Sequence, residues 1–227
     1  MVHGGAILAR AMRRTFIDRD DAGRQLGVAL RSAFKGREVL VLGLPRGGVP
    51  VAAAVADALE AQFDVLVVRK VGAPGHAELA MGAVAAGGIE ARVPEVLELL
   101  PDAARQFAAV AARERDEVTR REHAYRGSQA PLQLEGRVIV LVDDGVATGA
   151  TMEAAILACR QGRAARIVVA VPVAAPQAIA RLARLADDLI CLQQPPDFAA
   201  VGEWYQQFEQ LGDDDVRRCL AARRATP

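Results

Sequence analysis

The stretch VIVLVDDGVATGATMEAA, residues 138–155, decides the fold because it joins a buried strand to a helix through a short polar turn. Its first five residues form a continuous apolar run, which is typical of a strand buried on both faces. Asp143 and Asp144 follow, then a loop of small residues, and TMEAAILACRQ (151–161) has the apolar spacing of a helix. A strand, a turn and a helix in this order predict one unit of a parallel sheet.

The same pattern of strand and helix recurs along the chain. The apolar runs that predict strands are EVLVLGL (38–44), DVLVVRK (64–70), RIVVAVPVA (166–174) and DDLICL (187–192). Helices are predicted at 20–34, 49–61, 101–126 and 176–186. The glycine-rich segment 79–93 suggests either a pair of strands or a long flexible excursion. We therefore predict an α/β fold, with a mostly parallel sheet and helices on both of its faces.

Composition and charge limit the classes of protein to which the chain can belong. Its 227 residues, 52% of them hydrophobic, suffice for one core, so we expect a leader at 1–15 and a single domain at 16–227. Basic and acidic residues number 28 each, which favours neither nucleic acid nor a membrane surface as a partner. No apolar run has the length of a membrane span. The three scattered cysteines fit reduced thiols in a cytoplasmic protein better than disulfides or a zinc site.

Candidate site residues follow the predicted strands, because ligands of open parallel sheets bind beyond the carboxyl ends of the strands. The segments at these ends are PRGGVP (45–50), RKVGAPGHAE (69–78) and DDGVATGAT (143–151). The first two are basic, whereas the third begins with two acids and continues with small residues. Groups of opposite charge are therefore expected to meet at one edge of the sheet.

The loop 147–151 suits a phosphate group. Small side chains let an anion approach the backbone, N–H groups at the start of the helix point at it, and Thr148 and Thr151 add hydroxyl donors. Asp143 and Asp144 would repel a phosphate, so they suit the hydroxyls of a sugar or a hydrated cation. A sugar that carries a terminal phosphate satisfies both halves. The alternative is a pair of acids that only caps the helix.

These residues resemble a known family. IVLVDDGVATGAT (139–151) is similar to the phosphoribosyl pyrophosphate (PRPP) signature of type I phosphoribosyltransferases, and most similar to its adenine-type form. LPRGGVPVA, KVGAPGHAELAMGAV and the F-x-A-V-G-x-W-Y pattern at 198–205 resemble an uncharacterised bacterial group of that family. The resemblance covers roughly residues 16–220. It implies a type I phosphoribosyltransferase fold with a small hood and a flexible loop.

The resemblance also implies roles for residues. Thr148 to Thr151 would hold the 5-phosphate, Asp143 and Asp144 the ribose hydroxyls, and the PRGG loop, often with a non-proline cis peptide, the pyrophosphate. Magnesium would bridge pyrophosphate and ribose oxygens, touching both acids only through ribose hydroxyls or water. Catalytic roles fall to Asp143, Asp144, Arg46 and Lys70. The PRPP contacts would be Arg46, Gly47, Gly48, Arg69, Lys70, Asp143, Asp144, Gly145, Val146, Ala147, Thr148, Gly149, Ala150 and Thr151. For Arg69 and Lys70 the alternative is a solvated strand end.

A mobile loop at about 71–88 would close over the site and exclude water, which would otherwise hydrolyse PRPP. His76 and Glu78 lie in this loop and would either assist proton transfer to the acceptor or remain surface residues. Enzymes of the hypoxanthine-guanine type have an aspartate base where this sequence has Ala147. That difference argues against 6-oxopurine specificity more than against catalysis.

The acceptor would be recognised by a hood formed by about 195–211 and the N-terminal helix. Phe198 and Trp204 are the candidates to stack on a planar base. The alternative is that Trp204 and Phe208, four residues apart, attach a C-terminal helix to the sheet. The long helix at 101–126 has no place in a minimal phosphoribosyltransferase. Its apolar stripe would pack on the core or on a second subunit.

Two functions remain. The first is an enzyme that binds PRPP with magnesium, transfers phosphoribose to a nucleobase or similar nitrogenous acceptor and releases pyrophosphate, acting in the cytoplasm as a homodimer. The second is a catalytically silent PRPP-binding regulator of the same fold. A dinucleotide-binding or P-loop protein is excluded, because neither G-x-G-x-x-G after the first strand nor G-x-x-x-x-G-K-[ST] is present.

Overall fold

A computed structural model describes residues 15–224, apart from the side chains of residues 77, 78 and 224. The expected leader at 1–15 therefore lies, except for its last residue, outside the described residues. In the described part of the chain, no helix combines the length and the apolar composition that a membrane span requires.

The main sheet has five parallel strands in the order β2-β1-β6-β7-β8. They are β1 (Val39–Gly43), β2 (Gln62–Val65), β6 (Val138–Val142), β7 (Arg166–Val173) and β8 (Asp188–Gln193). The strand from the signature stretch, β6, lies at the centre between β1 and β7. Four of the five strands come from predicted apolar runs, and β2 overlaps its run only at residues 64–65. The predicted α/β fold with a mostly parallel sheet is confirmed.

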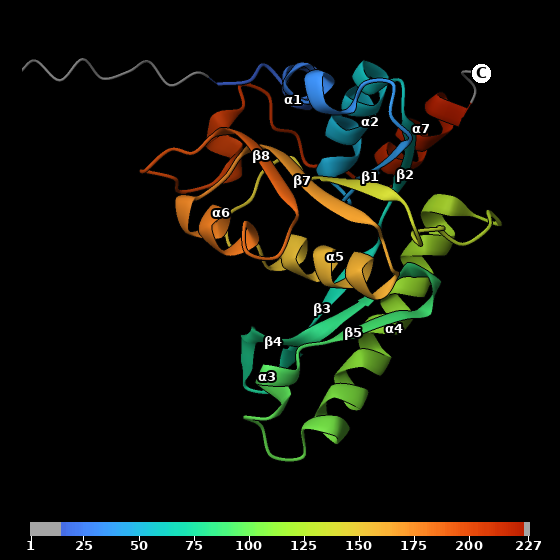
Figure 1. Ribbon diagram of the computed structural model, residues 1–227, viewed down its shortest axis with the longest axis vertical. Helices are drawn as coiled ribbons and strands as arrows, with labels where there is room; N and C mark the ends of the chain where they lie inside the picture. Colours follow the sequence, from blue (N-terminus) through green and yellow to red (C-terminus); the bar gives the residue numbers. More distant parts are fainter. Residues whose placement is uncertain (1–14, 225–227) are drawn as a thin grey trace, which may run out of the picture.

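Helices cover both faces of this sheet (Figure 1). The helices α1 (Arg19–Phe34) and α2 (Gly48–Leu59) lie on one face, and α5 (Ala150–Gln161) and α6 (Pro176–Leu182) lie on the other. Val140 and Val142 belong to the core under α1 and α2, whereas Ile139 and Leu141 belong to the core under α5. Because alternate residues of a strand face opposite sides, burial on both faces requires an unbroken apolar run.

A second sheet corrects one prediction. The run DVLVVRK (64–70) was expected as one strand, but it divides between β2 of the main sheet and β3 (Val68–Ala73) of another. Leu66 and Val67 are fully or almost fully buried where the chain crosses between the sheets. The crossing is as apolar as the strands, so the hydrophobic pattern does not mark it.

The second sheet is antiparallel, in the order β3-β4-β5, with β4 (His76–Ala85) and β5 (Ile89–Arg92) joined by the short helix η1 (Ala86–Gly88). Of the two interpretations of 79–93, the pair of strands is therefore correct. The segment 71–88, expected to be a mobile loop, forms most of this sheet. Closure of the segment over the site stays a prediction.

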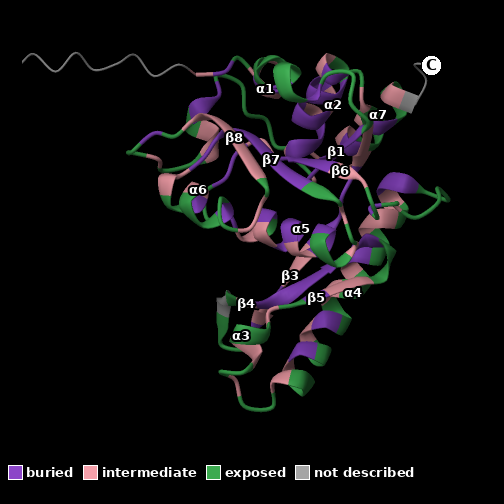
Figure 2. Ribbon diagram, in the orientation of Figure 1, coloured by how far each residue is buried: buried purple, intermediate pink, exposed green. Residues whose placement is uncertain are grey.

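The long helix α4 (Ala103–Arg126) packs along the second sheet, as its buried stripe shows in Figure 2. Phe107, Ala111 and Val118 are buried there in a cluster with residues of β3, β4 and α7 (Asp213–Arg224). Of the two expected partners for the stripe, the core is confirmed. Arg120 binds Glu117, three residues earlier in the same helix.

The helix α5 lies between the two sheets, since it contacts β6 and β7 of the first and β3, β4 and β5 of the second. Its first turn follows the small-residue loop, so that loop faces the second sheet as well as the edge of the first. The short helices α3 (Pro94–Leu97) and η2 (Val201–Trp204) complete the described elements.

Candidate active site

A cavity of about 490 Å³ lies beside the carboxyl ends of β1 and β6. It brings together three of the predicted segments: Pro45 of the PRGG loop, Arg69 and Lys70 of β3, and the loop that begins α5. The residues of that loop in the cavity wall are Thr148, Ala150 and Thr151. Basic side chains therefore face the predicted phosphate loop across an open space.

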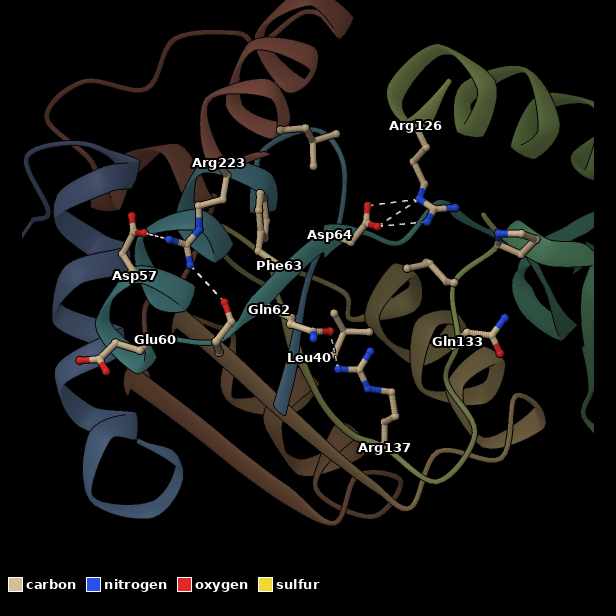
Figure 3. Close-up of a pocket in the computed structure, with 14 residues that line it drawn as sticks. Leu40, Asp57, Glu60, Gln62, Phe63, Asp64, Arg126, Gln133, Arg137 and Arg223 are labelled. Atoms are coloured by element: carbon tan, nitrogen blue, oxygen red, sulfur yellow. Dashed lines mark hydrogen bonds and ion pairs between the residues drawn. The ribbon is translucent and has the colours of Figure 1, made fainter. Parts of the chain in front are cut away.

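A larger cavity, of about 670 Å³, lies at the opposite edge of the main sheet, where β1 and β2 begin (Figure 3). Its arginines are largely paired with acids: Arg126 binds Asp64, and Arg223 binds Asp57. Ligands of such sheets bind beyond the carboxyl ends of the strands, and none of the predicted site residues lies in this larger cavity. We therefore assign the site to the smaller one.

The two acids of the signature do not line this cavity; they lie half-buried directly after β6. The Asp144 carboxylate accepts a hydrogen bond of 2.8 Å from Arg19 Nε, and both side chains are almost buried, at 13% and 11% exposure. Asp143 Oδ1 accepts the backbone N–H of Asp144 at 2.9 Å. Burial raises the pKa of Asp143, and the neighbouring charge of Asp144 raises it further. Burial also raises the pKa of Asp144, whereas Arg19 lowers it.

Arg19 is a residue that the sequence analysis missed. It lies in the acidic first turn of α1, which was read only as a helix start. Its guanidinium also donates to the carbonyl of Glu209 at 2.9 Å and stacks on the Phe208 ring at 4.0 Å. A basic residue among acids at the start of a helix, where the dipole disfavours positive charge, is the signal that could have revealed it.

The two glycines of the PRGG loop lie against the acids. A Cβ atom on Gly47 would overlap the Asp144 carboxylate, and one on Gly48 would lie 2.6 Å from the carbonyl oxygen of Val142. The peptide bond between Pro45 and Arg46 is cis, as the resemblance implied. Only glycine allows the loop after β1 to approach the end of β6 this closely.

Only part of the predicted phosphate loop is accessible to a ligand. Val146 is buried, its N–H donates to Val173 and its carbonyl accepts from Ala175, so its expected contact with PRPP is not available in this conformation. Ala147 and Thr148 are exposed. Gly149 has φ +82°, a left-handed conformation that suits glycine, and it begins α5. The exposed tip at 147–151, rather than Gly145 and Val146, is the part of the loop that a ligand can reach.

Arg181 of α6 is a second residue missed from the sequence. It donates to the carbonyl of Thr148 and lies 3.3 Å from a carboxylate oxygen of Glu153. Both contacts fix the turn before α5. Nothing in the local pattern of 176–186 indicates this role, because the contact depends on how α6 packs beside α5.

Arg46 lies elsewhere than predicted. It does not line the cavity in this conformation but donates to the Leu211 carbonyl at 2.7 Å and lies 3.6 Å from the Asp213 carboxylate. We call residues 206–212 the C-terminal strap. Its residues 206–210 are exposed, and Arg19 and Arg46 bind its backbone from either end. The strap therefore binds Arg46, the arginine that was expected to face pyrophosphate.

The hood residues form a small core. Trp204 is 4% exposed and clusters with Phe16 and Val173, so its ring is not available to stack on a base. Packing was the alternative for Trp204, but the expected helix at 204–208 is wrong, because η2 ends at Trp204 and the strap follows. Phe198 is half-buried beside the same cluster. Tyr205, also missed, donates its O–H to the Asp144 carbonyl.

His76 lies exposed at the start of β4, near the turn between β3 and β4. Glu78 lies two residues further along β4, and its side chain is outside the described part of the structure. The cavity reaches Gly72 and Ala73 in the same hairpin. A role for either residue in proton transfer stays a prediction.

The donor set bears on the expected magnesium. No group of three or more His, Cys, Asp and Glu side chains that could hold a metal occurs among the described residues. The Asp144 carboxylate is bound by Arg19, and Asp143 lies half-buried beside it. This set fits a cation that keeps water and substrate oxygens as ligands, which magnesium prefers, rather than one held directly by the protein.

The comparisons with known proteins agree with this geometry. A family model described as "Phosphoribosyl transferase domain" matches residues 20–207. The chain belongs to this family. Its phosphoribosyltransferase signature at 139–151 forms β6 and the loop before α5, and the matched range also contains the PRGG loop and β3. All segments that meet at the cavity therefore lie within the phosphoribosyltransferase domain.

Two relatives extend the comparison. A Mycobacterium tuberculosis (strain H37Rv) protein named "Putative phosphoribosyl transferase Rv0571c" is 44% identical over 203 residues, which are 89% of this chain and 46% of that protein. The chain thus spans about half the length of the curated relatives it matches. The crystal structure of the protein TT1426 from Thermus thermophilus is 45% identical with a TM-score of 0.85, covering 92% of this phosphoribosyltransferase chain and 98% of that one.

Proposed function

We propose that this chain binds PRPP and transfers its 5-phosphoribosyl group to a nitrogenous acceptor such as a nucleobase. The observation that carries the proposal is the cavity in which Arg69 and Lys70 face Thr148 and Thr151. The half-buried pair Asp143 and Asp144 lies against the PRGG loop, whose Pro45 reaches the wall of that cavity. Cations and hydroxyl donors suit the phosphates of PRPP, and carboxylates suit the ribose hydroxyls. One site thereby provides for both parts of the substrate.

The reaction breaks the bond between the anomeric carbon of ribose and the pyrophosphate oxygen, whose electron pair leaves with pyrophosphate. A nitrogen lone pair of the acceptor forms the new bond, and the acceptor gives up a proton if it attacks as a neutral N–H. Positive charge develops on the sugar as pyrophosphate leaves, so Asp143 and Asp144 stabilise the transition state. Lys70 and Arg69 stabilise the departing anion.

The acids, with substrate oxygens and water, would hold magnesium, which neutralises charge on the leaving pyrophosphate when it is bound. The chain's own residues orient the substrate around it. Arg46 would join them after leaving the strap. Thr148 and the amides at the start of α5 would hold the 5-phosphate in place.

Release of pyrophosphate tests the proposal. The protein would be incubated with PRPP, magnesium and one base at a time from a purine and pyrimidine panel, with PRPP binding measured by calorimetry. We expect release that depends on one base or one class of bases. Protein that binds no PRPP would contradict the assignment of the site.

A catalytically silent PRPP-binding regulator is the second candidate. Two contacts favour it: Arg19 occupies the Asp144 carboxylate, and the strap occupies Arg46. In this conformation the Asp144 carboxylate and the Arg46 guanidinium bind protein groups, whereas the transferase proposal requires both of them to bind the substrate. Binding of PRPP without release of pyrophosphate for every base in the panel would support this candidate instead.

If Asp213 and pyrophosphate compete for Arg46, removing the charge of Asp213 should strengthen the binding of pyrophosphate. Replacing Asp213 with asparagine removes the negative charge that lies 3.6 Å from Arg46 Nε but keeps an oxygen for the O–H of Tyr125, now bound at 2.7 Å. Because Arg46 would then leave the strap more easily, we expect pyrophosphate to bind about threefold more tightly, a shift within the range of an exposed ion pair. Calorimetry with pyrophosphate measures it. Asp214→Asn, which lies beside it but pairs with Arg217, is the control and should leave the affinity unchanged.

We also propose that the protein acts in the cytoplasm as a homodimer on small-molecule partners, without nucleic acid. The neutral overall charge and the three free cysteines among the described residues support this. Sedimentation equilibrium would test the assembly, and a monomer at micromolar concentration would contradict it.

A further inference from the structure

The helix α4 forms one wall of the candidate site. Val110, Glu114 and Arg121 of this helix line the same cavity as Arg69 and Thr148. Glu114 also accepts a hydrogen bond of 2.7 Å from Arg69 Nε. The helix that had no place in a minimal phosphoribosyltransferase therefore contributes charged groups to the space where the substrate is proposed to bind.

The charge of this wall favours an anion. Arg69, Lys70 and Arg121 are the basic side chains in the cavity wall, against one acid, Glu114. Arg69 is bound to that acid, so its charge is partly neutralised. Arg121 pairs instead with Glu117, whose carboxylate oxygen lies 2.6 Å from Arg121 Nε. Glu117 does not line the cavity, so the acid that pairs with Arg121 lies outside the wall, whereas the acid that pairs with Arg69 is part of it.

The geometry of Arg121 suits a phosphate. Its bond to Glu117 uses Nε, and its terminal guanidinium nitrogens donate to no group of the described residues. Those nitrogens can donate to two oxygens of one phosphate, an arrangement that gives strong, charge-assisted hydrogen bonds. At 24% exposure, the side chain is shielded enough for such bonds to matter and still reaches the cavity.

The neighbouring Arg120 shows that an ion pair with Glu117 does not by itself place an arginine in the cavity wall. Both arginines bind the same carboxylate, that of Glu117, which has its pKa lowered to about 2 by Arg120 and Arg121. Arg120 is 58% exposed and lies outside the cavity wall. The helix thus carries two adjacent arginines with one shared partner, and one of them faces the site.

We propose that Arg121 is a substrate-binding residue that contacts a phosphate group of PRPP, either the 5-phosphate or the pyrophosphate. This inference rests on the proposed function, since it concerns the same site. It makes α4 part of the substrate-binding machinery of this chain.

The test compares Arg121→Gln with Arg120→Gln. Each change removes one of the two arginines that bind Glu117 and leaves the other in place. Calorimetry with PRPP, pyrophosphate and ribose 5-phosphate, each with magnesium, would measure binding. We expect Arg121→Gln to weaken PRPP binding about tenfold to 100-fold, as loss of hydrogen bonds to a charged group does, and Arg120→Gln to change it less than twofold. Arg121→Lys, which keeps the charge, should recover part of the loss.

Binding of pyrophosphate and of ribose 5-phosphate shows which phosphate group of PRPP Arg121 contacts. Weaker binding of pyrophosphate with unchanged ribose 5-phosphate would place Arg121 at the leaving group, and the reverse would place it at the 5-phosphate. Equal PRPP affinities of the Arg121→Gln and Arg120→Gln proteins would overturn the inference while leaving the proposed function standing. Wild-type protein that binds none of the three ligands would overturn both.

Discussion

Replacing Asp144 with asparagine is expected to lower kcat/KM for PRPP about 100-fold, the size of effect seen when one electrostatic contact to a transition state is removed. Asparagine has the same shape and keeps an oxygen for Arg19 and for the substrate. It lacks the negative charge that would stabilise the cationic sugar. The initial rate of pyrophosphate release, measured with the acceptor identified by the panel, checks this.

A loss of activity could also follow from a weaker fold, because Arg19 is almost buried and binds Asp144 at 2.8 Å. Breaking such a pair can cost about 3 kcal/mol of stability. The double variant Arg19→Gln with Asp144→Asn separates the two effects, since two neutral amides can pair with each other. We expect the double variant to recover most of the stability and none of the activity. Normal turnover by Asp144→Asn would show that its charge has no part in catalysis.

Replacing Arg126 with alanine is expected to lower the free energy of unfolding by about 3–5 kcal/mol. Arg126 is 6% exposed and joins the end of α4 to β2 through both carboxylate oxygens of Asp64, at 3.1 and 3.2 Å. It also donates to the Ala130 carbonyl at 2.7 Å. Without the guanidinium, the carboxylate of Asp64, itself only 16% exposed, would keep its charge and lose its partner. Figure 3 shows this pair at the edge of the larger cavity.

Urea denaturation followed by circular dichroism measures this loss. Arg120→Ala is the control, because it removes an arginine that is 58% exposed from the same helix, and we expect the free energy of unfolding to stay nearly unchanged. The pair with Asp64 lies at the opposite edge of the main sheet from the candidate site, so folded Arg126→Ala protein should retain its PRPP affinity. A loss below about 1 kcal/mol would mean that the pair contributes little to the fold.

The sequence predicted the central strands of the main sheet well because β1, β6 and β7 are buried on both faces along nearly their whole length. Such strands need unbroken apolar runs, and those at 39–43, 138–142 and 166–173 became neighbouring parallel strands. The edge strands β2 and β8 are less buried, and β2 overlaps its predicted run only at 64–65. The pattern failed at Leu66 and Val67, where the chain leaves one sheet for the other. A buried crossing has the same composition as a buried strand, so local hydrophobicity cannot separate them.

The candidate site was predicted in its parts and not in its assembly. Thr148 follows β6 as predicted, whereas Arg69 and Lys70, expected at the end of a strand, lie within β3, and the structure brings all three to one cavity. Arg46 matched the same pattern, yet it binds the strap. The conformation of a long side chain depends on which partners surround it, and Leu211 and Asp213 lie more than 160 residues away in the chain.

By itself, the sequence determined the α/β fold, the position of the acid pair and the nature of the phosphate loop, because these depend on local patterns of burial, charge and residue size. Only the tertiary structure decided which distant groups meet there: Arg19 on Asp144, Arg181 on the Thr148 carbonyl and Arg121 in the cavity wall. These contacts bring side chains of α1, α4 and α6 to the loop after β6 or to the cavity beside it. Their partners are chosen by how the helices pack on the two sheets, which no local pattern records.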